Sequence, residues 1–148
     1  KQMKTKPIHY LLVGGQFAAL IVAALAGKVF PINWLVYLLY ALAMLLAVSA
    51  VYSMKLHTLT AMPMPKQGSK LCQSGPYRIL RHPMYSSLLV IMLAFLINDF
   101  NWWRMLSALL LCAVIFSKIK IEEKALLQKF DDYSLYMKKT WGIVPYIY

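Results

Sequence analysis

The sequence predicts an all-α membrane protein, with four transmembrane helices as two hairpins followed by a cytosolic amphipathic helix. Hydrophobic residues make up 61% of the chain and charged residues only 14%, against about 25% charged residues in a typical soluble domain. The apolar residues form long runs rather than the short periodic sets of a soluble helical protein. The basic residues lie mostly between and beyond these runs. These observations exclude a disordered chain and most classes of soluble enzyme, and predict a single multi-pass membrane domain over residues 1–148.

The first two apolar runs are long enough to cross a bilayer. Residues 8–27 and residues 31–54 contain no Lys, Arg, Asp or Glu. Twenty helical residues rise about 30 Å, the thickness of the hydrocarbon core. Pro31 suits the first turn of the second helix. The short linker between the runs predicts a tight antiparallel hairpin. Small residues on one side of the first run favour close helix packing: Gly14, Gly15, Ala18, Ala19, Ala23 and Ala24.

Two shorter runs, residues 83–98 and 102–117, predict a second hairpin. Sixteen residues give about 24 Å of helix, slightly less than the hydrocarbon core. Trp102 and Trp103 fit an aromatic belt at the membrane surface. Arg104 is expected to extend its charged end to that same surface.

Fourteen of the sixteen basic residues lie on one predicted side of the membrane: before the first run, in loop 55–82, or in the C-terminal segment 118–148. Only Lys28 and Arg104 lie on the other side. Since basic residues are concentrated in cytoplasmic loops, both termini and the central loop are predicted to be cytoplasmic. The membrane is the inner membrane in a bacterium or the endoplasmic reticulum in a eukaryote. The net charge of +11 is thereby explained without nucleic acid.

The sequence indicates no metal site, because no pair of Cys or His has zinc spacing. The two cysteines, Cys72 and Cys112, are too few for a disulfide framework. None of the four runs has a carboxylate in its interior, which argues against a proton-coupled transporter. The small residues of the first run permit a dimer but do not require one.

The first polar segment, residues 66–85, ends at the start of the third run. Arg81 and His82 precede Pro83, which suits the first position of a helix. The unpaired N–H groups of a helix start, with two basic neighbours, favour a carboxylate or phosphate ligand. Contact of the same residues with lipid headgroups is an open alternative.

The second polar segment, residues 117–148, contains a predicted helix from about residue 122 to 139. Glu122 and Glu123 lie in its first turn or where the fourth run continues into it. They either stabilise the helix start or bind a cation such as a ligand ammonium. The tail, residues 141–146, lies in the membrane interface or folds back over the site. An apolar stripe marks one face of the helix: Leu126, Phe130, Tyr133 and Met137.

The two polar segments are expected to meet, because the third run begins and the fourth run ends on the same predicted membrane face. This topology places His82 and Tyr85 close to Lys118 and Glu122. Positive groups on one side and carboxylates on the other suit a zwitterionic ligand.

Two blocks resemble the isoprenylcysteine carboxyl methyltransferase family, with which related membrane methyltransferases of phospholipid amines and small thiols share the signature. Residues 75–85 are similar to the family motif G-x-Y-x-x-x-R-H-P-x-Y. Residues 122–136 and Pro145 resemble its C-terminal block E-E-x-x-L-x-x-x-F-G-x-x-Y-x-x-Y…P. The resemblance covers roughly residues 66–146.

The resemblance implies methyl transfer from S-adenosylmethionine, leaving S-adenosylhomocysteine, at the cytosolic membrane face. The acceptor is lipophilic or small: an isoprenylcysteine-like carboxylate, a lipid amine or a thiol. Glu122 matches the carboxylate that meets the methionine part of the cofactor, and Lys118 matches a basic position on the substrate side. The cofactor-binding residues implied by motif position are Ser69, Lys70, Leu71, Cys72, Tyr77, His82, Pro83, Met84, Tyr85 and Glu122.

Catalytic roles are expected for Arg81 and Glu122, since the methyl donor is already activated and the protein must mainly hold the reactants in line. Arg81, Arg78 or Lys118 would orient an anionic acceptor, and a carboxylate or thiolate needs no general base. An amine acceptor would need a base such as Glu123 or a tyrosinate.

The chain departs from the family pattern at four positions, which leaves the acceptor open. Lys118 stands where Arg is usual, Ser87 and Asp131 replace Gly, and Trp141 replaces Pro. Two other functions stay open as alternatives. One is a membrane reductase of the sterol-reductase type, although the chain lacks a Gly-rich phosphate loop. The other is a four-span protein without enzymatic activity, such as a small transporter.

Overall fold

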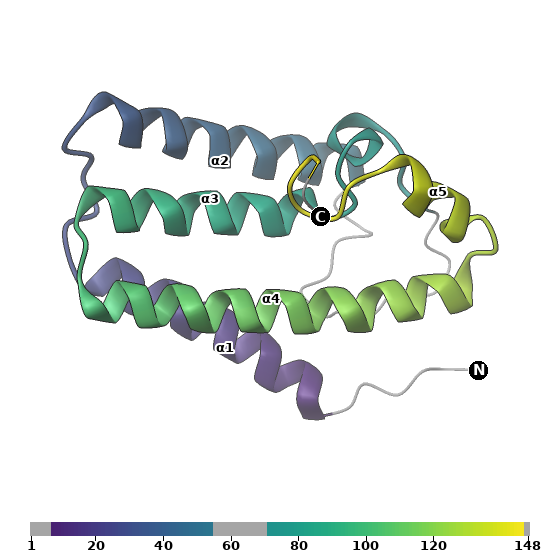
Figure 1. The fold of residues 1–148 in the computed structure, drawn as a ribbon, viewed down its shortest axis with the longest axis horizontal. Helices are drawn as coiled ribbons and strands as arrows, with labels where there is room; N and C mark the ends of the chain where they lie inside the picture. Colours follow the sequence, from purple (N-terminus) through teal and green to yellow (C-terminus); the bar gives the residue numbers. More distant parts are fainter. Residues whose placement is uncertain (1–6, 55–70, 147–148) are drawn as a thin grey trace.

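The polypeptide is a bundle of helices (Figure 1). The computed structural model describes residues 7–54 and 71–146. In this part of the chain the β pairing is limited to one isolated bridge, so the predicted all-α class is confirmed. The elements are α1 (Pro7–Leu25), α2 (Trp34–Met54), the 3-10 helix η2 (Gly75–Arg78), α3 (Pro83–Asn98), α4 (Trp102–Lys129) and α5 (Tyr133–Lys139).

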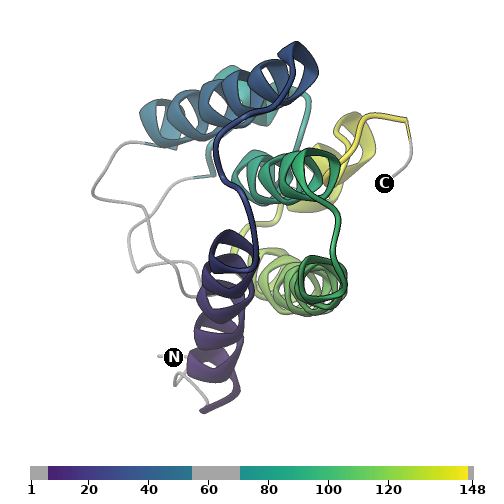
Figure 2. The same ribbon diagram turned by 90° about the vertical axis from the view of Figure 1, so that its left-hand side faces the viewer.

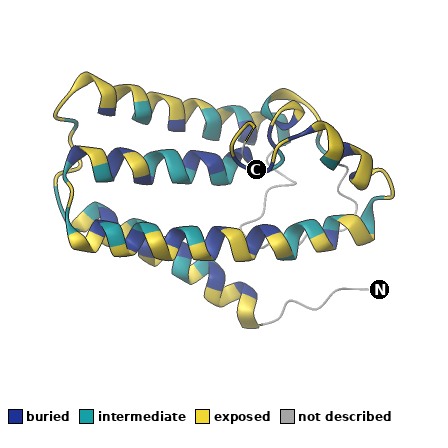
Figure 3. Cartoon of the chain, viewed as in Figure 1, coloured by how far each residue is buried: buried dark blue, intermediate teal, exposed yellow. Residues whose placement is uncertain are grey.

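Two helices are long and apolar enough to cross a membrane. α1 has 19 residues and α2 has 21, and neither contains Lys, Arg, Asp or Glu. Much of their surface is exposed, along α2 in particular (Figure 3), and it includes large apolar side chains such as Phe17 and Leu45. Exposed apolar area of this extent is unfavourable in water and suits contact with lipid. α3 is also apolar, but it has only 16 residues.

The helices pair differently from the first of the two predicted hairpins, whereas α3 and α4 are joined by a short turn and contact each other, as the second hairpin predicts. α1 packs mainly along α4, and α2 packs mainly along α3. Viewed from the end of the bundle, α3 lies between α2 and α4, and α1 lies beside α4 (Figure 2). The prediction of a tight hairpin between the first two runs is therefore wrong. The connection over residues 26–33 is long enough to separate the two helices.

Small residues of α1 mediate its contact with α4. Ala19 and Ala23 are completely or almost completely buried and join the main apolar core with Leu111 and Ile115 of α4. A Cβ atom on Gly15 would lie 3.3 Å from Cγ2 of Val114. The predicted close packing of small residues is therefore confirmed for Gly15, Ala19 and Ala23, which follow one another at one-turn spacing and contact α4. Gly14 and Ala18, which belong to the same predicted face, are exposed.

The N-terminus of α2 is three residues later than predicted. Pro31 lies in the connection, and the helix begins at Trp34 after Asn33. The side chain of Asn33 accepts a hydrogen bond from the Val36 N–H group at 3.1 Å. Asn is among the most favourable residues at this position because it satisfies an otherwise unpaired N–H group. By contrast, α3 begins at Pro83 and ends at Asn98, as predicted.

The predicted amphipathic helix over residues 122–139 is interrupted. α4 continues without a break from the fourth apolar run to Lys129, and α5 begins at Tyr133. Phe130 has extended backbone angles (φ −126°, ψ 115°), and Asp131 and Asp132 form a turn. Short acidic side chains favour turns over helix interiors because they compete for backbone hydrogen bonds. Glu122 and Glu123 therefore lie within α4.

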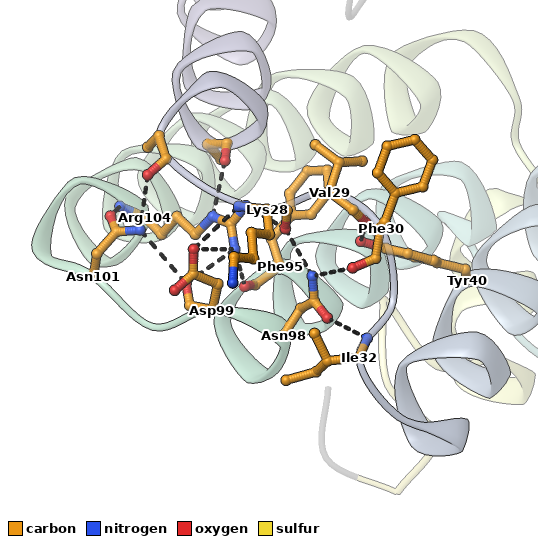
Figure 4. A network of polar contacts seen from close by, with 12 residues as sticks. Lys28, Val29, Phe30, Ile32, Tyr40, Phe95, Asn98, Asp99, Asn101 and Arg104 are labelled. Carbon is orange, nitrogen blue, oxygen red and sulfur yellow. Dashed lines mark hydrogen bonds and ion pairs between the residues drawn. The ribbon is translucent and has the colours of Figure 1, made fainter.

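Arg104 does not extend to the surface, which corrects the sequence-based expectation. Its side chain is fully buried at the end of the bundle where α1 and α3 terminate (Figure 4). Its guanidinium donates hydrogen bonds to four backbone carbonyl groups at 2.8–3.0 Å, those of Ala23, Lys28, Phe95 and Asp99. A buried cation at these positions satisfies the unpaired carbonyls and opposes the negative ends of the helix dipoles.

Candidate functional site

The candidate site lies at the opposite end of the bundle, where the C-terminal half of α4 meets the segment before α3 (Figure 1). Lys118 and Glu122 are four residues apart and therefore lie on the same face of α4. The continuation of α4 to Lys129 carries this face toward residues 79–86 and α5. The predicted meeting of the two polar segments is confirmed by the contacts described below.

His82 lies between the two glutamates. Its Nε2 atom is 3.2 Å from Oε1 of Glu123, and its Nδ1 atom is 3.6 Å from Oε2 of Glu122. The first distance is that of a hydrogen bond and the second is too long for one. The imidazole is almost completely buried and stacks on the ring of Tyr85, with ring centres 5.6 Å apart. His82 is thus held in a fixed orientation between the carboxylates.

Glu122 has a carboxylate oxygen without a partner. Its Oε2 atom is buried, and no hydrogen bond to it is made within the described part of the chain. A buried, unpaired oxygen of this kind costs free energy, about 1–3 kcal/mol or more if it is charged. An unsatisfied acceptor beside His82 and Tyr85 therefore marks a position where a ligand donor would be stabilised.

Arg81 joins α4 to the end of α5. Its Nε atom donates to Oε1 of Glu123 at 2.8 Å, and its Nη1 atom donates to the carbonyls of Met137 and Thr140. Because the last carbonyls of α5 have no partners within that helix, Arg81 satisfies them as a cap. Two of its three nitrogens are committed in this way, and its predicted role toward an anionic acceptor stays a prediction.

The C-terminal tail folds back onto the start of α3. The N–H groups of Arg81 and His82 donate to the carbonyls of Trp141 and Gly142 at 2.7 and 3.0 Å. The hydroxyl of Ser86 donates to the carbonyl of Ile143 at 2.6 Å, and Ile143 packs in the main core. Of the two predicted arrangements of the tail, the structure has the one in which it folds back.

Tyrosines surround the two carboxylates and the contacts of Arg81 with α4 and α5. The Tyr136 hydroxyl donates to the carbonyl of Tyr77 at 2.6 Å. Burial raises the pKa of Tyr136 to about 12, and burial also raises the pKa values of Tyr77 and Tyr133. These phenols are therefore neutral at physiological pH. The Tyr133 hydroxyl is buried and, like Glu122 Oε2, has no partner among the described residues.

Lys118 is buried at the contact between α4 and α1. Its ammonium donates to Oε1 of Gln16 at 2.5 Å and lies 5.2 Å from the centre of the Tyr85 ring. Only 1% of Lys118 is exposed. The predicted substrate-side residue thus lies beside the aromatic ring that faces His82.

Most of the predicted site residues occupy this region. His82, Pro83 and Tyr85 start α3, next to Glu122 and Lys118, and Met84 lies among them. Leu71 and Cys72 are partly buried before η2, where the Cys72 thiol donates to the carbonyl of Ser53 at the end of α2. Ser69 and Lys70 fall outside the described residues.

Three residues of the site were missed at the sequence level. Gln16 was not singled out, although it is the one amide side chain in the first apolar run and such groups often bind across helices. Ser86 and Thr140 anchor the tail and α5 through backbone carbonyls, and their positions carry no recognisable signal.

We expect Glu123 to contribute to stability in a pH-dependent way. Burial alone would raise the pKa of Glu123, but hydrogen bonds and electrostatic attraction from His82 and Arg81 lower it overall. A carboxyl group whose pKa is lowered in the folded state stabilises the protein at pH values above its ordinary pKa of 4.5. This contribution is lost as the pH falls through the pKa of the folded state. Thermal unfolding of the detergent-solubilised protein between pH 3 and 7 should show a steeper acid loss in the wild type than in Glu123→Gln. Asp131→Asn, at an exposed carboxylate, should keep the wild-type slope, and equal slopes in all three proteins would contradict the assignment.

Comparison with known proteins identifies the family. The family model PEMT, phospholipid methyltransferase, matches residues 32–132, more than half of the chain. The match begins before α2 and ends in the turn before α5, so it includes both the start of α3 and the carboxylates of α4. No curated protein matches the chain. The chain therefore belongs to the phospholipid methyltransferase family of integral membrane methyltransferases.

Proposed function

We propose that the protein transfers a methyl group from S-adenosylmethionine to a lipophilic or small acceptor at the cytosolic face of the membrane. Family membership supports methyl transfer, and the resemblance of residues 75–85 and 122–136 supports the identity of the donor. The unpartnered Oε2 atom of Glu122, buried beside His82, is the observation that carries the proposal.

The residues present fit the amino-acid end of the proposed donor. An α-ammonium group has three N–H donors and a positive charge, which would satisfy the buried acceptor of Glu122. The Tyr133 hydroxyl interacts electrostatically with Glu122 and offers an unused donor to a carboxylate. The other residues that would hold the cofactor, by motif position, are Ser69, Lys70, Leu71, Cys72, Tyr77, His82, Pro83, Met84 and Tyr85.

The proposed topology has four membrane-spanning segments with both termini in the cytoplasm. α1 and α2 supply two of them. We propose that α3 and the apolar half of α4, residues 102–117, supply the others. The distribution of basic residues supports a cytoplasmic position for the site. The exposed apolar faces of the helices would then contact lipid, from which an apolar acceptor enters laterally.

The protein contributes to the reaction mainly by positioning the reactants and excluding water. A bound S-adenosylmethionine supplies a sulfonium-activated methyl group. His82 and Tyr85 line the approach to Glu122, while the tail through Ile143 closes one side of the site. An acceptor held in line with the methyl carbon in such a site reacts without a large entropy loss in the transition state. The neutral tyrosines and the ion-paired Glu123 are poor bases, which favours an acceptor that is already anionic.

Calorimetric titration with S-adenosylhomocysteine tests the proposal. We expect Glu122→Gln to weaken binding about 10- to 100-fold, because a charge-assisted hydrogen bond is worth about 1.5–3 kcal/mol. Thermal stability of the free protein should stay constant or rise, because the substitution removes an unsatisfied buried carboxylate.

Asp131→Asn is the matched control, since it removes one negative charge at an exposed position outside the site. It should bind S-adenosylhomocysteine like the wild type. Absence of binding to the folded wild-type protein would overturn the proposed function. Equal affinities of the wild type and Glu122→Gln would remove Glu122 from the site.

A further inference from the structure

The C-terminal tail has an inner side that is bonded to the candidate site and an outer side that is exposed. On the inner side, the carbonyls of residues 141–143 accept hydrogen bonds from residues 81–86. On the outer side, Trp141 is 40% exposed and Tyr146 is 86% exposed, although both are large aromatic residues. Their ring centres are 5.3 Å apart. The tail that folds back over the site therefore leaves an aromatic pair uncovered.

The tail lies at the level of the first turn of α3, as its course back from α5 shows (Figure 1). The 3-10 helix η2, which precedes α3, packs against α2. A Cβ atom on Gly75 of η2 would overlap the hydroxyl of Ser53, next to the last residue of α2. In the proposed topology these helix ends mark the cytosolic boundary of the hydrocarbon core. Trp and Tyr side chains are enriched at this boundary, because one end of each is apolar and the other is polar.

The end of α5, which leads into the tail, is basic. Lys138 and Lys139 are exposed, and neither takes part in an ion pair within residues 7–54 and 71–146. Residues 133–148 contain no Asp or Glu. Anionic lipids of the cytoplasmic leaflet attract basic side chains that lie close to the membrane surface. Two uncompensated lysines beside an aromatic pair at the membrane boundary therefore favour anionic headgroups as their partner.

We propose that the end of α5 and the tail, residues 138–146, form a lipid-binding surface that docks on anionic headgroups of the membrane in which the protein lies. This contact goes beyond the proposed function, and only its effect on the cofactor rests on that function. A segment held by a few backbone hydrogen bonds opens locally at a low cost in free energy. Lipid bound on the outer side stabilises the tail in the position in which its inner side binds Arg81 and His82. Anionic lipid thereby closes the site and raises the affinity for the cofactor.

The first test measures amide hydrogen exchange of the full chain in nanodiscs without cofactor. One set of nanodiscs contains phosphatidylcholine alone, and the other contains phosphatidylcholine and phosphatidylglycerol in equal amounts. The N–H groups of Arg81, His82 and Trp141 bind across the tail. They are expected to exchange at least about fivefold more slowly in the anionic nanodiscs, the effect of one lysine near an anionic surface. At about 1 M salt this difference should disappear, because charges are then screened beyond about 3 Å.

Two matched double variants identify the lysines that bind the lipid. Lys138→Gln/Lys139→Gln should exchange at the same rate in the two kinds of nanodisc. Lys120→Gln/Lys124→Gln is the control, because it removes the same charge from exposed positions of α4. Its lysines lie on a continuous helix that does not move with the tail, so it should keep the lipid dependence of the wild type. Equal exchange of the wild type in both kinds of nanodisc would overturn the inference, and so would an unchanged lipid dependence in Lys138→Gln/Lys139→Gln.

Titration with S-adenosylhomocysteine in the same nanodiscs tests the effect on the cofactor site. We expect the wild type to bind it about fivefold more tightly in the anionic nanodiscs, and Lys138→Gln/Lys139→Gln to bind it equally in both. Equal affinities of the wild type, with exchange that still depends on lipid, would overturn the link between the lipid contact and the site. Absence of binding in both kinds of nanodisc would contradict the proposed function, whereas the exchange rates would still decide the lipid contact.

Discussion

Replacing Arg104 by Gln is expected to lower the free energy of unfolding by about 3–5 kcal/mol, because several buried backbone carbonyls would lose their donor at a cost of about 1–3 kcal/mol each. The fully buried guanidinium donates to four carbonyl groups from the ends of α1 and α3 and the loops that follow them (Figure 4). A Gln side chain is shorter and has two N–H donors, so most of these carbonyls would lose their partners. If this end of the bundle lies within or near the bilayer, lipid supplies no replacement donors.

Unfolding of the purified protein by increasing mole fractions of denaturing detergent would measure this effect. Lys120→Gln is the control, because Lys120 is exposed on the same helix and its replacement should change stability little. The cofactor affinity of folded Arg104→Gln should be unchanged, since Glu122 lies 18 residues further along α4, about 27 Å away. A loss of less than about 1 kcal/mol would contradict the structural role of Arg104.

The network around Arg104 explains why the sequence-based expectation for this residue failed. A basic residue next to two tryptophans has the pattern of a membrane-surface anchor. Its partners are backbone carbonyls from two other segments, and side-chain identity does not encode carbonyl positions. Asn98 reinforces the same junction by donating to the carbonyls of Lys28 and Phe30 at 2.7 and 2.9 Å. Gly27 approaches Asp99 and Arg104 so closely that a Cβ atom would overlap the carboxylate.

The sequence predicted individual helices better than their pairing. The limits of α3 follow from local signals, Pro83 at its start and the polar turn after Asn98, and both are correct. Periodicity cannot identify the partner of an apolar helix, because most neighbouring apolar faces are chemically alike. The small residues of α1 indicated close packing, but only the folded chain shows that α4 is the partner.

The site was predictable where topology alone determines it. Placing the start of α3 and the end of the fourth run on one face was enough to bring His82 near Glu122. The break at Phe130 was not foreseen, because the apolar stripe continues in phase across it. Gln16 was missed for a related reason: it faces the site only because α1 packs on α4 instead of α2.

Replacing Arg81 by Gln is expected to weaken S-adenosylhomocysteine binding by about tenfold or more and to loosen α5. The substitution leaves the partly buried carboxylate of Glu123 with His82 as its one ion-pair partner among the described residues. It also removes the donor to the carbonyls of Met137 and Thr140. Removing one partner of a buried charge pair is costly, and truncating a positioning contact of this kind commonly costs about 2–5 kcal/mol. Here the cost falls on the place where α4, α5 and the tail meet, because the partners of Arg81 in the part of the chain that the structure describes belong to these three segments.

Two measurements on the same variants distinguish positioning from direct catalysis by Arg81. The rate of amide hydrogen exchange in α5 and at the N–H group of Trp141 should increase in both Arg81→Gln and Arg81→Lys. Lysine does not replace the arginine, because it has no planar fork of donors that reaches Glu123 and the α5 carbonyls together. Arg78→Gln, at an exposed arginine of η2, should leave both exchange and binding unchanged. A residue that only orients an acceptor would leave α5 protected and cofactor binding intact in Arg81→Gln. If α5 stays protected from exchange in both variants, Arg81 is assigned to the acceptor. If this protection is lost, the cofactor site depends on the contacts between α4, α5 and the tail.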